Sequence, residues 1–192
     1  MGECRILPIP NRLAFRAWLQ EHSQNEEECF LLLKRGEPKD DGSFYYLDAV
    51  EEALCFGWID SVSTSADGQS VQRFSPRSKN SPWTELNKER ARRLIHLDLM
   101  QPSGIAVLPA MGPRSFHLDE DVETALKKAR VYKIFRSFPP LYQRVRGYNV
   151  AFFKKRDPEA YQKALTNLIR YTKQGKMYGM WHDYGRLLNW DK

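Results

Sequence analysis

The sequence predicts an α+β fold, with a small, mainly antiparallel sheet packed with helices and a helical C-terminal region after it. Short apolar runs bounded by turn residues occur in the first half of the chain, and apolar residues at helical spacing recur along its length. The composition, 42% hydrophobic and 12% aromatic over 192 residues, is that of a globular protein. We expect residues 1–112 to form the α+β domain and residues 113–192 to form a basic helical region.

A helix over residues 45–56 is the element around which we expect the first domain to be organised. Asp48, Glu51 and Glu52 place negative charge near its N-terminus, where the helix dipole favours it, and Gly57 is the expected C-terminal stop. Adjacent helix positions point about 100° apart. Glu51 and Glu52 are therefore interpreted as solvated or helix-dipole carboxylates and not as an acid–base pair.

A helix and a short strand are predicted before this central helix, and two strands are predicted after it. An amphipathic helix is expected to begin after Asn11, its N-cap, and the apolar run 30–33 is typical of a short strand. Beyond the central helix, residues 58–63 and 71–74 alternate as strands do, with a turn signal at 66–68 between them. We therefore predict a β-hairpin.

Four more helices are predicted after the hairpin. The first is expected to use Ser81 as its N-cap, to place Pro82 at its first position and to end near Leu99. Helix-start signals for the other three stand at Asp119, Pro139 and Asp157. The last third of the chain is therefore expected to be helical.

The net charge of +6 hides a strong asymmetry along the chain. Residues 1–125 contain 14 Lys+Arg and 20 Asp+Glu, whereas residues 126–192 contain 16 and 4. The basic region is explained either as a solvated helical surface or as a binding surface for nucleic acid or an anionic membrane. Lys154-Lys155-Arg156 supports the second explanation, together with Tyr142, Tyr148, Phe152 and Phe153, although these aromatics fall at the spacing of a helical core.

Several classes of function lack their usual signatures. Cys4, Cys29 and Cys55 are widely spaced and the four histidines stand alone, so neither a disulfide framework nor a metal site is expected. Cys55 has no histidine close in sequence and is interpreted as a core residue. The motifs GxGxxG, GxxxxGK[ST], GxSxG and HExxH are absent, so no cofactor is expected and no catalytic pair can be named. No apolar run is long enough to span a membrane, and the cytoplasm is the expected location.

Three segments together resemble one bacterial family. They are Ala53-Leu54-Cys55-Phe56-Gly57-Trp58-Ile59-Asp60-Ser61, Arg73-Phe74-Ser75-Pro76-Arg77 and Ser81-Pro82-Trp83-Thr84-Glu85-Leu86-Asn87. In this order and spacing, the stretch 12–112 is similar to the YdeI/OmpD-associated family. That resemblance implies a setting of bacteriocin protection or stress resistance, and no particular reaction. Residues 132–192 do not match the C-terminal segment of that family, so nothing is carried over to them.

The same motifs give a candidate ligand site. If the hairpin lies beside the start of the next helix, they bring together Trp58, Asp60, Arg73, Arg77, Trp83 and Asn87. Free N–H groups at a helix start and two arginines can hold a carboxylate or phosphate, and tryptophans can line a site for a sugar or a base. The structural alternative pairs Asp60 with Arg73 or Arg77 and buries the tryptophans in the core.

Three functional hypotheses follow. The first is a stress-resistance protein with a pocket for an anionic small molecule, and the second is a module that binds nucleic acid or an acidic partner through the basic C-terminal region. The third is an enzyme that acts on an anionic metabolite.

Overall fold

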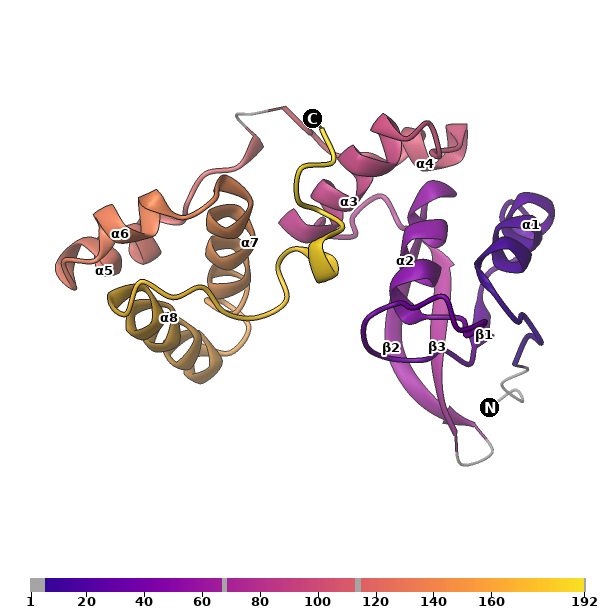
Figure 1. The fold of residues 1–192 in the computed structure, drawn as a ribbon, viewed down its shortest axis with the longest axis horizontal. Helices are drawn as coiled ribbons and strands as arrows, with labels where there is room; N and C mark the ends of the chain where they lie inside the picture. The colour runs from indigo at the N-terminus through magenta and orange to yellow at the C-terminus, as the bar shows by residue number, and fades with distance from the viewer. Residues whose placement is uncertain (1–5, 67–68, 113–114, 192) are drawn as a thin grey trace. The chain divides into compact units, whose positions relative to one another are not determined.

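The computed structural model describes residues 6–66, 69–112 and 115–191, which form two compact units. Unit 1 comprises Met1–Pro82 and Arg90–Pro109, and unit 2 comprises Trp83–Glu89 and Ala110–Lys192. Unit 1 contains α1 (Arg12–His22), β1 (Cys29–Leu31), α2 (Tyr46–Cys55), β2 (Trp58–Ala66), β3 (Gln69–Pro76) and α4 (Pro102–Ala106). Unit 2 contains α5 (Glu120–Lys128), α6 (Tyr132–Ser137), α7 (Pro140–Ala151) and α8 (Pro158–Lys173), and α3 (Glu85–His96) contributes to both units. The predicted α+β fold is confirmed (Figure 1).

The sheet of unit 1 has three antiparallel strands in the order β1-β3-β2. The register pairs Trp58 with Pro76 and Cys29 with Phe74, and a shift in register follows Asp60. The predicted hairpin is therefore confirmed, although two residues of its turn signal, Asp67 and Gly68, lie outside the described residues.

The central helix α2 is buried on every side. It begins and ends close to the predicted limits, and Gly57 follows it with φ at +77°, a left-handed conformation that glycine adopts without strain. In Figure 1, α2 lies over β2 and β3. Its buried residues are Leu47, Ala49, Val50, Glu51, Glu52, Ala53, Leu54 and Cys55. Because they include apolar side chains around the whole helix, α2 is a core element and not an amphipathic surface helix.

The first helix, α1, closes the core on one side. Asn11 caps it as predicted, since its side-chain oxygen accepts a hydrogen bond of 2.9 Å from the Ala14 N–H. Phe15 and Leu19 on its inner face are fully buried, and the Phe15 ring lies 5.6 Å from that of Phe74 on β3. The helix therefore packs its aromatic face against the sheet.

The predicted start of α3 was wrong. Ser81 and Pro82 precede the helix and do not belong to it, and the helix begins at Glu85. The Thr84 hydroxyl accepts a hydrogen bond of 3.1 Å from the Asn87 N–H, the pattern of a side-chain cap. A capping threonine three residues after the serine thus sets the boundary. The helix also ends earlier than expected, at His96.

The helices of unit 2 enclose a second core. Three of them start where the sequence predicts, with Asp119 and Asp157 as N-caps and Pro140 at the first position of α7, whereas α6 had not been predicted. The buried residues of this second core are Val122, Leu126, Val131, Phe135, Leu141, Tyr142, Val145, Val150, Tyr161, Leu165, Leu168, Trp181 and Leu187. The C-terminal segment after α8 therefore supplies two residues to the core.

Asp119 combines a helix cap with an ion pair. Its side chain accepts hydrogen bonds from the Asp121 and Val122 N–H groups, and Lys154 Nζ lies 3.0 Å from its carboxylate. Partial burial alone would raise the pKa of Asp119, but the hydrogen bonds from Lys154 and Val122 outweigh it and hold the pKa below its ordinary value. Asp119 therefore stabilises the fold above the unfolded pKa, about 4, and this contribution is lost as the pH falls through the folded pKa.

Asp119→Ala is expected to lower the free energy of unfolding by about 1–2 kcal/mol near neutral pH, because it removes both the cap and the ion pair. Thermal unfolding followed by circular dichroism at about pH 7 and about pH 3 measures this effect, and the difference from the wild type should shrink at the acid pH. Asp119→Asn is the matched control, since it keeps a capping oxygen and should lose less. An equal loss at both pH values would contradict a role for the charge.

Candidate functional site

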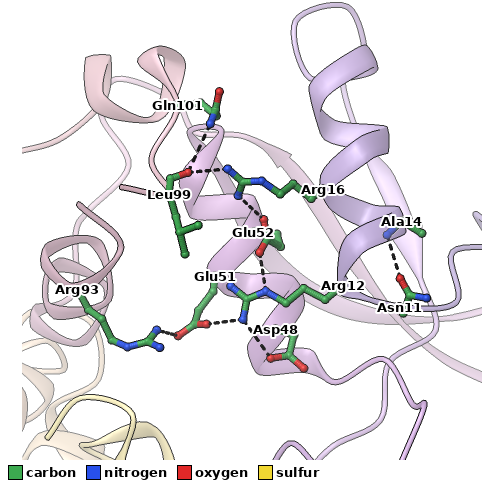
Figure 2. Close-up of polar contacts among 10 residues, drawn as sticks. All are labelled: Asn11, Arg12, Ala14, Arg16, Asp48, Glu51, Glu52, Arg93, Leu99 and Gln101. Carbon is green, nitrogen blue, oxygen red and sulfur yellow. Dashed lines mark hydrogen bonds and ion pairs between the residues drawn. The ribbon is translucent and has the colours of Figure 1, made fainter. Parts of the chain in front are cut away.

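A cluster of buried charges lies in unit 1 between α1 and α2 (Figure 2). Glu51 and Glu52 are buried, with 0% and 2% of their surface exposed, and Asp48 stands one turn before them on the same helix. Three arginines surround these carboxylates: Arg12, Arg16 and Arg93. We call these six residues the ion cluster. The interpretation of Glu51 and Glu52 as solvated was wrong.

Every carboxylate oxygen of the two glutamates faces an arginine. Glu51 Oε1 lies 2.8 Å from Arg93 Nη1 and its Oε2 lies 3.0 Å from Arg12 Nη1. Glu52 Oε1 lies 2.6 Å from Arg12 Nε, and its Oε2 lies 2.7 Å from Arg16 Nη1. Arg12 thus bridges the two neighbouring glutamates, because its guanidinium group presents several N–H donors in one plane.

Arg12 and Arg16 are held in their charged form. Burial lowers the pKa of Arg12 and of Arg16, but the Glu52 carboxylate more than offsets this effect, so both pKa values lie above the ordinary value. Arg16 also donates a hydrogen bond of 2.8 Å to the Leu99 carbonyl oxygen, which ties α1 to the segment after α3. Because three carboxylates face three arginines, the ion cluster is a structural tie and not an anion-binding site.

The two described cysteines, Cys29 and Cys55, are buried free thiols. Burial raises the pKa of each thiol to about 12, and the Glu52 carboxylate adds to this effect at Cys55. A thiol is a nucleophile only as the thiolate, so both cysteines are unreactive near neutral pH. The sequence-based interpretation of Cys55 as a core residue is confirmed.

The candidate residues on β2 lie on the helix side of the sheet. Trp58 is 1% exposed, and its indole N–H donates a hydrogen bond of 3.1 Å to the Ser23 carbonyl oxygen. Asp60 accepts a hydrogen bond of 2.6 Å from the Tyr46 hydroxyl. Burial and the Asp60 carboxylate together hold the Tyr46 pKa above its ordinary value. Trp58 and Asp60 therefore anchor the hairpin to the helices.

Arg73 and Arg77 do not share the surroundings of Trp58 and Asp60. Arg73 contacts the Glu28 carboxylate and lies 3.2 Å from the Ser61 hydroxyl, on the strand face opposite to Asp60 and Phe74. Arg77 is buried just beyond β3 and donates a hydrogen bond of 3.2 Å to the Pro82 carbonyl oxygen. Trp83 and Asn87 belong to unit 2. Within unit 1, the structure does not bring Asp60 and Arg73 to one surface.

A cavity lies within unit 2, on the side of α7 that faces α8. Its volume is about 520 Å³, within the usual range of small-molecule sites. Aromatic and apolar side chains dominate its walls, and five polar side chains join them. Its lining residues are Thr84, Arg146, Tyr148, Asn149, Val150, Phe152, Phe153, Ala160, Lys163, Ala164, Asn167 and Tyr178. We call this cavity the α7/α8 pocket.

Arg146, one of the two cations in the α7/α8 pocket, packs against an aromatic ring and a glycine. Its guanidinium carbon lies 4.9 Å from the centre of the Tyr178 ring, which stacks in turn on Tyr171 at 4.5 Å. A Cβ atom at Gly179 would lie 2.8 Å from Arg146 Nη1, so the absence of a side chain there permits the close approach. Arg146 Nε is buried and makes no hydrogen bond among the described residues. It is therefore a donor that can serve a ligand oxygen.

Sequence reasoning did not find this pocket. It assigned Tyr148 and Phe152 to the inner face of α7 by their spacing, but both are only partly buried and line the cavity. Arg146 and Lys163 were counted only as part of a basic region. They come together because α7 and α8 pack against each other, which a pattern within one helix does not reveal.

Comparison with known protein families identifies the family of this chain. The sequence model of a family described as a domain of unknown function (DUF8412) matches residues 7–107, more than half of the chain. The chain belongs to this family. Its description names no activity. No curated protein and no solved structure matches the sequence.

The two sites differ in their relation to the DUF8412 match. All residues of the ion cluster lie within residues 7–107, so the ion cluster belongs to the DUF8412 region of this chain. Among the lining residues of the α7/α8 pocket, only Thr84 lies within residues 7–107. The pocket is therefore almost entirely a feature of the C-terminal region that follows the DUF8412 match.

Two further properties concern only the described ranges 6–66, 69–112 and 115–191. No helix within them has the length and apolar character needed to cross a membrane. Within the same ranges, no three His, Cys, Asp or Glu side chains are grouped as metal ligands would be.

Proposed function

We propose that this DUF8412 protein binds a small anionic molecule with a flat apolar part in the α7/α8 pocket. The observation that carries the proposal is the composition of the pocket, whose aromatic walls are joined by two cationic side chains, Arg146 and Lys163. Aromatic rings favour a flat apolar group, and the two cations favour a carboxylate, sulfonate or phosphate. Asn149 and Asn167 add amide groups that can orient the ligand.

The setting that we propose for this binding is stress resistance. It rests on the resemblance of residues 12–112 to the YdeI/OmpD-associated family, whose members are linked to bacteriocin protection. The DUF8412 match covers nearly the same stretch. In this proposal the protein is a binding protein, and an enzyme acting on the same class of anionic metabolite is the alternative.

Nucleic acid or another acidic partner at the basic C-terminal region is the second alternative. Lys155 and Arg156 are exposed, but Lys154 pairs with Asp119 and Asp121 at 3.0 and 2.6 Å. Tyr142 is buried in the core, and Tyr148, Phe152 and Phe153 line the α7/α8 pocket. This arrangement supports the pocket over a stacking surface for bases.

The proposal predicts that the fluorescent anion 1-anilinonaphthalene-8-sulfonate binds the α7/α8 pocket of the native protein. Lys163→Gln should weaken that binding by about 3- to 10-fold, the effect of removing one exposed charge from a binding site. Ala160→Trp should abolish it, because an indole ring would occupy part of the cavity. Fluorescence titration measures both effects.

Matched controls separate the pocket from general charge effects. Lys173→Gln removes an exposed lysine on the same helix, outside the pocket, and should leave the affinity unchanged. The uncharged analogue N-phenyl-1-naphthylamine should bind the wild type and Lys163→Gln equally. Equal weakening in both lysine variants, or unchanged binding in Ala160→Trp, would refute the proposal. Binding of an oligonucleotide that falls steeply with salt would favour the second alternative.

A further inference from the structure

A second, more polar cavity lies within unit 2, beside the start of α3 and on another side of α7. Its volume is about 330 Å³, at the small end of the range for ligand sites. Glu85, Lys88 and Ser115 supply polar atoms to it, and Phe116 and Tyr148 supply aromatic walls. We call it the Glu85 pocket.

Glu85 is a buried carboxylate with one oxygen left open. Only 1% of its surface is exposed. Its Oε1 accepts a hydrogen bond of 2.7 Å from Lys88 Nζ, whereas its Oε2 makes no hydrogen bond among the described residues. Arg144 Nε faces Oε2 at 3.7 Å, beyond hydrogen-bonding distance, while Arg144 Nη2 donates to Glu89 at 2.7 Å. A buried acceptor that makes no hydrogen bond carries a desolvation cost, which a ligand donor would remove.

Ser115 adds a second such atom to the same pocket. Its hydroxyl oxygen is buried and has no hydrogen-bond partner within the described part of the chain. A hydroxyl group both donates and accepts. A ligand hydroxyl can therefore donate to Glu85 Oε2, and a neighbouring ligand oxygen can accept from the Ser115 hydroxyl.

The charges around the Glu85 pocket favour a neutral ligand. Glu85 faces Lys88 and Arg144, and Asp119, the other lining carboxylate, faces Lys154. Because cations of the protein already neutralise these two carboxylates, a positively charged ligand would gain little by pairing with them. Aromatic rings pack well on the C–H faces of a sugar ring, and Phe116 and Tyr148 can provide such a surface.

We infer that the Glu85 pocket binds a small neutral polyhydroxylated molecule of monosaccharide size, through hydroxyl hydrogen bonds to Glu85 and Ser115. This site goes beyond the proposed function, because it takes a different class of ligand and the residues that carry it do not line the α7/α8 pocket. Tyr148 lines both cavities, so it is left unchanged in the test.

Saturation-transfer NMR with glucose, galactose and myo-inositol at about 10 mM tests the inference, since this concentration detects millimolar affinities. At least one of the three should receive saturation from the wild-type protein. Ser115→Ala should weaken its binding at least about 5-fold. Because the serine hydroxyl makes no hydrogen bond to the described residues, the same substitution should not lower the melting temperature.

Two more variants complete the test. Ala151→Leu should abolish binding by filling the cavity, and Ser137→Ala, outside the pocket, should leave it unchanged. Absence of saturation transfer to all three compounds would overturn the inference. Binding unaffected by both Ser115→Ala and Ala151→Leu would overturn it as well. Neither variant should alter the anilinonaphthalenesulfonate titration, so this inference and the proposed function can fail separately.

Discussion

Replacing Glu51 with alanine is expected to lower the free energy of unfolding of unit 1 by about 3–5 kcal/mol, the usual cost of removing one partner from a buried ion pair. Glu51 is fully buried and joins Arg93 to Arg12 at 2.8 and 3.0 Å. Its loss leaves two guanidinium groups close together with one carboxylate fewer to neutralise them. Urea unfolding, with hydrogen exchange of the α2 amides read by mass spectrometry, reports the loss for this unit.

Two control substitutions identify the cause of that loss. Glu51→Gln keeps the shape of the side chain and an acceptor oxygen but removes the charge, so its effect should fall between wild type and Glu51→Ala. Glu27→Ala removes an exposed carboxylate of the same unit and should change stability by less than about 0.5 kcal/mol. If Glu51→Ala behaved like Glu27→Ala, the ion cluster would contribute nothing measurable.

The ion cluster also marks the limit of what the sequence could predict. Glu51 and Glu52 follow Asp48 near the start of a helix, the pattern of helix-dipole carboxylates at a surface. The sequence does not reveal that α1 brings Arg12 and Arg16 against them from 35 or more positions away. Such burial depends on tertiary packing, because each charge is tolerated inside only with the others in place.

Elements with one apolar face were predicted well. In α8, Tyr161, Leu165, Leu168 and Thr172 recur at the spacing of one helix face, and all four are buried. The local period of the helix is sufficient for such a prediction, because one side of α8 meets the core. In contrast, the start of α3 depended on which of two possible caps forms, and Thr84 forms it instead of Ser81.

The candidate ligand residues show why closeness in sequence does not make a site. Asp60 and Arg73 belong to paired strands, but their side chains leave opposite faces of the sheet. A strand register that is wrong by one residue would exchange the two faces. The motifs indicated which residues lie near the hairpin, and only the register showed that Asp60 faces Tyr46 while Arg73 faces Ser61.

The second large effect is expected at Gly104, in the short helix α4. A Cβ atom there would lie 2.2 Å from the Cys55 carbonyl oxygen at the end of α2, a contact that cannot be relieved by turning a side chain. The Gln101 N–H donates a hydrogen bond of 2.9 Å to the same carbonyl. Gly104→Ala should therefore force α4 away from α2 and lower the free energy of unfolding by at least about 3 kcal/mol.

Gly112→Ala is the matched control for this substitution, because a Cβ atom at that position would meet none of the described residues within 4 Å. Its effect should stay within about 0.5 kcal/mol of zero. Hydrogen exchange should show the loss in Gly104→Ala as faster exchange at the C-terminal end of α2, where the Gln101 hydrogen bond is made. If both variants unfold at the same urea concentration as the wild type, the close approach of α4 to Cys55 does not exist in solution. If only Gly104→Ala is destabilised, the small residue at this position is what allows α4 to close the end of the central helix.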